Sequence, residues 1–187
     1  GIFTAGVTTV VFGVVKNPEV SGATGTFTIT TTDNSNAAID TLTTVPAVTI
    51  TAGVISVADV TPASLVAGAS GAATATFTTA NPVPADGKFV VTFPANFDVT
   101  GATVTAITGQ TGAAGAYTIN CAGQVCTVTR GAGAGIFTAG VTTVVFGVVK
   151  NPSATGATGT FTITTTTNGD AAIDTLTTVP AVTITAG

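Results

Sequence analysis

Few side chains in this sequence could do acid–base or nucleophilic chemistry. The 187 residues include no His, four Lys and Arg, eight Asp and Glu, and two Cys. Enzymes use His, carboxylates, Lys and Cys as proton carriers and nucleophiles. With so few of these groups, we expect no catalytic site and no cofactor.

The two cysteines are separated by four residues. Alternating residues precede Cys121 and follow Cys126, so a hairpin with a four-residue loop would place them opposite each other on neighbouring strands. That placement is compatible with a disulfide, which would indicate an oxidising, extracellular setting. Free thiols are the alternative. Half of a Cys-x4-Cys metal site is a second alternative, but the sequence has no His or third Cys to complete it.

Acidic residues in two loops are weak candidates for calcium ligands. Asp170 lies close to Asp174, and Asp33 lies close to Asp40. Calcium takes roughly six to eight oxygen ligands, usually including several carboxylates, whereas each loop offers two. Asx-type turns explain these residues better, so we expect no metal site.

Three other patterns have specialised uses that the sequence does not favour. An isopeptide bond from Lys88 or Lys150 would need an Asn or Asp on the last strand, which has neither. The Thr-x-Thr run at 160–164 indicates a solvated strand face rather than an ice-binding array. Asn151 precedes a proline, which blocks N-glycosylation. O-linked glycans on the Thr faces remain possible partners.

Charge and hydropathy exclude two further classes. A net charge of −4 with four basic residues argues against nucleic-acid binding, which needs many Lys and Arg. The longest apolar stretch, at 144–149, is too short for a transmembrane helix. The sequence starts at a Gly inside a repeat, so we expect its true beginning to be missing. The lack of a signal peptide therefore carries no weight.

Alternating hydrophobicity predicts short antiparallel strands. In 159–165, Phe161 and Ile163 point to one face and threonines to the other. Residues 141–149 are apolar on both faces, which predicts a central strand. Further strands are predicted at 54–60, 73–78, 88–93, 99–107, 117–121, 126–130 and 181–185. Short strands separated by Gly, Pro and Asn turns predict an all-β sandwich.

The chain repeats itself at a spacing of 134 residues. GIFTAGVTTVVFGVVKNP occurs at Gly1 and again at Gly135, and the copies 1–53 and 135–187 differ at six positions. The differences are Glu19/Ser153, Val20/Ala154, Ser21/Thr155, Asp33/Thr167, Ser35/Gly169 and Asn36/Asp170. All six lie in predicted loops, which tolerate change, so we expect the copies to share one fold.

The repeat predicts one complete unit and part of another. Residues 54–187 form the complete 134-residue unit, and 1–53 form the C-terminal part of a preceding unit. In 1–53, several apolar residues would face no partner: Val10, Phe12, Phe27, Ile29, Val48 and Ile50. A few strands without a second sheet cannot close a core. We therefore expect another segment or chain to complete 1–53.

Two routes to that completion are open. In the first, the 134-residue unit recurs head to tail in a longer polypeptide, which near-identity of the copies favours. In the second, the 187-residue chain is a subunit whose first segment pairs with a neighbour, as in donor-strand addition. Either route gives heterologous association, which produces a filament unless it closes into a ring.

Several stretches resemble the tandem immunoglobulin-like sandwich repeats of giant microbial extracellular surface proteins. They are VTPASLVAGASG at 60–71, ATATFTTA at 73–80, PADGKFVVTFP at 84–94 and GATGTFTITTT at 156–166. The resemblance implies an immunoglobulin-like fold and an extracellular structural or adhesive role at a cell surface.

The leading hypothesis is a structural repeat of an extracellular filament whose partners are other copies of the same unit. The alternative is an adhesin or carbohydrate-binding stalk module. That alternative predicts an aromatic platform on loops, yet Tyr117 is the only Tyr. An enzyme is a distant third.

Overall fold

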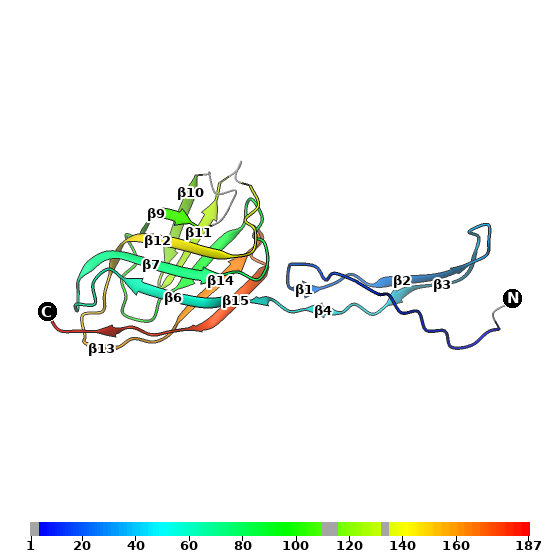
Figure 1. The fold of residues 1–187 in the computed structure, drawn as a ribbon, viewed down its shortest axis with the longest axis horizontal. Helices are drawn as coiled ribbons and strands as arrows, with labels where there is room; N and C mark the ends of the chain where they lie inside the picture. The colour runs from blue at the N-terminus through cyan, green and yellow to red at the C-terminus, as the bar shows by residue number, and fades with distance from the viewer. Residues whose placement is uncertain (1–3, 110–115, 132–134) are drawn as a thin grey trace.

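The structure is a computed structural model that describes residues 4–109, 116–131 and 135–187. It consists of a β-sandwich and an extended arm, which is residues 4–52 (Figure 1). The first three residues of the repeat copy, 1–3, lie outside the described residues. All regular elements in the described residues are strands, as predicted. Within the same residues, no helix is long and apolar enough to cross a membrane.

The sandwich consists of two main sheets and one short ribbon. Its strands are β5 (Gly53–Val54), β6 (Ser56–Pro62), β7 (Ser70–Thr78), β8 (Lys88–Thr92), β9 (Thr103–Thr108), β10 (Tyr117–Ala122), β11 (Val125–Arg130), β12 (Val141–Lys150), β13 (Gly156–Ala157), β14 (Phe161–Thr166), β15 (Ala172–Val179) and β16 (Thr183–Ile184). One sheet has the order β10-β11-β8-β14-β15-β5 and the other β6-β7-β12-β9, while β13 pairs with β16.

Period-two alternation places phenylalanines between the two sheets. Phe161 and Ile163 of β14 are fully buried, as their alternation with threonine predicts. Phe93, just after β8, makes edge-to-face contacts with Phe146 of β12 at 5.6 Å and with Phe161 at 5.7 Å between ring centroids. The core therefore joins rings from the middle of the chain to rings near its C-terminal end.

Strand β12 is central, as its two apolar faces predict. It pairs antiparallel with β7 on one side and with β9 on the other. A bulge near its end places Val148 at φ 57°, a conformation that a β-branched residue adopts at a cost. Pairing on both sides holds this bulge in place.

Several sequence-based strand predictions differ from the structure. The strand predicted at 54–60 is divided between β5, which pairs with β15 in one sheet, and β6, which pairs with β7 in the other. Strand β15 was not predicted, because a buried Asp174 and two register shifts against β14 hide its alternation. The strand predicted at 99–107 begins only at Thr103, because the amide of Ala102 donates to the carbonyl of Val99 in a turn.

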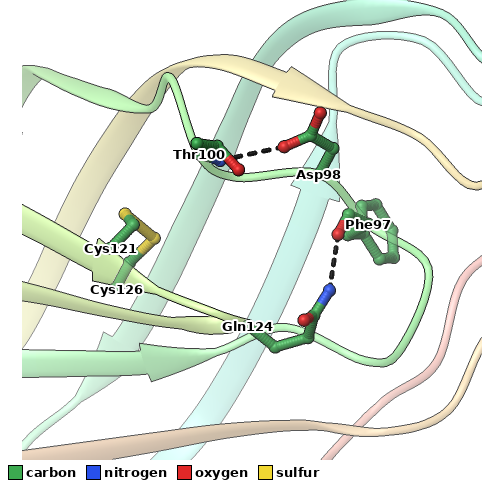
Figure 2. The surroundings of a disulfide bond; sticks show 6 residues. All are labelled: Phe97, Asp98, Thr100, Cys121, Gln124 and Cys126. Atoms are coloured by element: carbon green, nitrogen blue, oxygen red, sulfur yellow. Dashed lines mark hydrogen bonds between the residues drawn. A yellow bond between two sulfur atoms is a disulfide. The ribbon is translucent and has the colours of Figure 1, made fainter.

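The predicted disulfide joins Cys121 of β10 to Cys126 of β11, which are register partners (Figure 2). The connection is tighter than the predicted four-residue loop, because Ala122 and Val125 also pair and leave Gly123 and Gln124 as the turn. The side-chain amide of Gln124 donates to the carbonyl of Phe97, which ties the hairpin to the loop after β8.

The loop after β8 is itself ordered by a local hydrogen bond. The backbone amide of Thr100 donates to the Asp98 carboxylate at 3.0 Å (Figure 2). This bond and a second one from the Thr100 hydroxyl lower the pKa of Asp98. The carboxylate therefore acts as the acceptor of a local turn.

Outside the sandwich, the arm carries four short strands: β1 (Gly22–Ala23), β2 (Phe27–Thr32), β3 (Ala38–Val45) and β4 (Thr49–Ile50). Strand β2 pairs with β3, and β1 pairs with β4. The arm extends away from one end of the sandwich (Figure 1). Its strands therefore have few contacts with the core.

Removal of the disulfide should weaken the sandwich modestly. The bond closes a loop between residues five apart, for which loop-closure entropy predicts a loss of about 2 kcal/mol in the free energy of unfolding. Urea unfolding of the Cys121→Ala/Cys126→Ala variant and of the oxidised wild type measures this loss. Wild type under reducing conditions is the control and should lose a similar amount. Equal stability of all three samples would contradict a stabilising role.

Candidate inter-unit interface

The arm forms the same hairpin as its copy in the sandwich. In the arm, Phe27 pairs with Val45 and Ile29 with Leu42. The sandwich has the corresponding pairs Phe161↔Val179 and Ile163↔Leu176, with register shifts at the same places. The β1–β4 and β13–β16 ribbons also share one register. The local sequence is therefore sufficient to specify these two pairings.

The segment before the hairpin behaves differently in the two copies. Residues 7–16 and 141–150 have the same sequence, VTTVVFGVVK. Residues 141–150 are β12, hydrogen-bonded to β7 and β9, whereas 7–16 form no strand. The strand at this repeat position depends on partners from 54–134. We call 54–134 the front segment and 135–187 the back segment.

The side chains predicted to lack a partner are mostly in water. The exposed fractions are 68% for Val10, 75% for Phe12, 47% for Phe27, 59% for Ile29 and 51% for Val48, while Ile50 is half-buried. In the back segment, Val144, Phe146, Phe161 and Ile163 are fully buried, Ile184 is 2% exposed and Val182 is half-buried.

The difference in burial has a large energetic consequence. Full burial of a Val, Ile or Phe side chain contributes about 1.5–3 kcal/mol. Val10, Phe12, Phe27 and Ile29 obtain only part of this in the arm, while their copies obtain nearly all of it. The arm is therefore an apolar surface with a defined shape and a strong tendency to be covered.

An open groove of about 670 Å³ runs between the coil at 8–12 and strand β2. Val10 and Phe12 line one side, and Ile29 lines the other. Their copies belong to β12 and β14, which lie in opposite sheets. The groove therefore corresponds to the space that the sandwich fills with its core.

The front segment covers the corresponding surfaces of the back segment. Strands β7 and β9 flank β12, and β8 pairs with β14. The ring of Phe93 contacts both Phe146 and Phe161. The sandwich therefore shows which strands and side chains of a front segment cover the apolar surfaces of a back segment.

Arg130 at the end of β11 fastens the two segments together. The residue is 2% exposed, and its guanidinium donates to the carbonyl of Pro84 at 2.8 Å and to that of Gly135. The same group lies 3.9 Å from the ring centroid of Phe137, a cation–π contact. Burial lowers the pKa of Arg130. This role of Arg130 could not be predicted from the sequence, because a lone Arg carries no pattern.

The arm and the sandwich meet at a short hydrogen-bonded joint. Ser21 donates to the carbonyl of Ala172 from its amide at 2.9 Å and from its hydroxyl at 2.7 Å. Strand β5 pairs parallel with β15, which places Gly53 beside Asp174. A Cβ on residue 53 would lie 2.1 Å from Oδ1 of Asp174, so only glycine fits.

Asp174 is the buried carboxylate of this joint. It is 0% exposed and accepts hydrogen bonds from the amides of Ala80 and Asn81 at 3.1 and 3.0 Å. The side-chain amide of Asn81 adds a third at 2.8 Å. Its copy in the arm, Asp40, is exposed and accepts a hydrogen bond from the Thr31 hydroxyl. Asp174 therefore ties β15 to the front segment.

The calcium candidates are engaged with protein groups. Asp170 forms an ion pair with Lys88 at 2.6 Å, and Asp174 accepts the three hydrogen bonds above. In the arm, Asp33 accepts from the amides of Ser35 and Ala37, an Asx-type turn. Within the described parts of the chain, no three or more His, Cys, Asp or Glu cluster as metal ligands would.

Comparisons with known proteins do not supply a family. Neither the family models nor the curated proteins give a match. The functional inference therefore depends on the internal repeat and on the unpaired arm.

The two copies of one aspartate should differ in their effect on stability. Asp174→Ala removes the buried acceptor of three hydrogen bonds, from the amides of Ala80 and Asn81 and from the Asn81 side chain. A hydrogen bond to a charged group contributes about 1.5–3 kcal/mol, so the free energy of unfolding should fall by at least about 2 kcal/mol. Asp40→Ala is the matched control on an exposed site and should change it by less than about 0.5 kcal/mol. Urea unfolding compares the two. Equal losses would contradict the role assigned to Asp174.

Proposed function

We propose that this chain is a structural unit of an extracellular protein filament or surface fibre, joined to its neighbours head to tail through β-strand and apolar contacts. One observation carries the proposal. The arm copies the sequence and hairpin register of a buried half of the sandwich, yet its apolar side chains are exposed.

The positions of the two repeat ends support a linear arrangement. Gly53 enters the sandwich at the end from which the arm extends, whereas its copy Gly187, the chain terminus, lies at the opposite end (Figure 1). A surface at one end that matches a surface elsewhere on the molecule gives heterologous contacts. Repetition of such contacts builds a filament.

The extracellular setting is supported by the disulfide and by the sequence resemblance. Disulfides persist in oxidising compartments. The likeness to immunoglobulin-like repeats of giant microbial surface proteins points to the same setting. In this proposal the repeat is a mechanical element, and Arg130 and Asp174 serve to hold backbone groups together.

A filament role is favoured over a carbohydrate-binding one by the position of the aromatic rings. Sugar-binding modules present aromatic side chains on exposed loops. Here most described rings are fully or nearly fully buried in the sandwich: Phe77, Phe89, Phe93, Phe97, Phe137, Phe146 and Phe161. The exposed rings Phe12 and Phe27 lie on the arm, where their copies mark a packing surface.

Immunogold electron microscopy of whole source cells and of thin sections tests the proposed function. Antibodies raised against the sandwich should label linear appendages outside the cell, at many points along their length. Pre-immune serum is the control. Labelling confined to the cell interior, or scattered over a surface without appendages, would contradict a filament. Labelling confined to fibre tips would support the adhesin instead.

A further inference from the structure

The chain contains one front segment but two near-identical back segments. Residues 1–53, which include the arm, and residues 135–187 differ at six of 53 positions, all in loops. The front segment can bind one back segment, because the space between β7 and β9 holds one strand, β12, and the free edge of β8 pairs with one strand, β14. Two segments with almost the same sequence therefore compete for one binding place.

The front segment has little basis for discriminating between them. Every buried apolar residue of the described back segment has the same residue at its copy position. One contact differs, since Asn36 stands where Asp170 pairs with Lys88. In that pair the Asp170 side chain is 74% exposed and the Lys88 side chain 14% exposed, and an ion pair whose carboxylate is open to water contributes little. The arm therefore fits the place of the back segment.

Exchange of the two segments within one chain is barred by geometry. In the back segment's place, Gly53 would lie where Gly187 lies, whose Cβ position is 3.1 Å from the Val66 side chain. Ser56, three residues further on, pairs with Thr78 inside the front segment, at the end of β6 remote from Val66. Three residues span at most about 11 Å, whereas β6 alone is about 20 Å long, so both placements cannot hold. The arm can enter only the front segment of another molecule.

We propose that the arm binds the front segment of a second copy of this chain, in the register that the back segment occupies there, and that the resident back segment is its competitor. In that register, 7–16 lie between β7 and β9 of the second copy, and β2 pairs with its β8. This assignment names the two surfaces that meet in the proposed head-to-tail contact. It rests on the proposed function only for the direction of assembly.

The numbers of segments decide when chains assemble. In the 187-residue chain without substitutions, an arm that enters a front segment releases the back segment that was bound there, so equal amounts of apolar surface are uncovered and covered. Disabling the resident back segment leaves one front segment and one usable arm per chain. Front segments and usable arms are then equal in number, and head-to-tail association covers the apolar surface of every one.

Matched substitutions in the two copies test this competition. Phe146→Asp places a charge in the core and disables the back segment, and Phe12→Asp does the same to the arm. Each full-length variant is refolded from denaturant and measured by light scattering across a concentration series. We expect Phe146→Asp to form oligomers at growing multiples of 17.9 kDa. Wild type should form oligomers only at the highest concentrations, because each contact displaces a resident back segment, and Phe12→Asp should stay at one chain.

A double variant separates specific assembly from misfolding. Phe12→Asp/Phe146→Asp has no usable back segment, so the oligomers should disappear. If this variant associates as Phe146→Asp does, association is non-specific and the proposal is overturned. It is also overturned if Phe146→Asp remains monomeric at every concentration.

A cysteine pair tests the register. The hydroxyls of Thr76 and Thr143 lie 3.3 Å apart on register partners, and Thr9 is the copy of Thr143. In the Phe146→Asp background, Thr9→Cys/Thr76→Cys should cross-link between chains on oxidation. As the control, Thr76→Cys/Thr143→Cys in the native chain should cross-link within one chain. An intrachain link in the first variant would overturn the proposal. The filament itself is tested separately by the labelling of cells.

Discussion

The structure depends on the packing of the back segment against the front segment. The back segment supplies β12 and β14, which need β7, β9 and β8 as hydrogen-bonding neighbours and Phe93 as a core contact. The arm shows the same sequence without those neighbours. There the hairpin persists, the first strand is lost and the apolar residues are exposed.

Two polar contacts make this packing specific. Arg130 holds the start of the back segment through the carbonyl of Gly135, and Asp174 holds its middle through the amides of Ala80 and Asn81. Both charged groups are buried and bonded to backbone partners across the boundary between the segments. Buried charges are costly unless paired in this way, so they favour one arrangement of the two halves.

The sequence predicted the all-β sandwich, the central strand at β12 and the repeat, because alternation and identity are visible in a single chain. It did not predict β15, since a buried Asp174 interrupts the apolar pattern. Nor did it identify Gly53 or Arg130, whose roles depend on which atoms lie beside them after folding. The hairpin of the cysteines was predicted, but its turn is tighter because the register extends past the disulfide.

Hydrogen exchange of the two identical stretches, 7–16 and 141–150, tests the central claim most directly. Peptides extended to Glu19 or Ser153 differ in mass and can be told apart. If front-segment partners create the strand, amides of 141–150 should exchange at least about 1,000-fold more slowly than those of 7–16, given ordinary domain stability. Equal protection in both stretches would show that the sequence forms this strand without the front segment of its own chain, and would contradict the account.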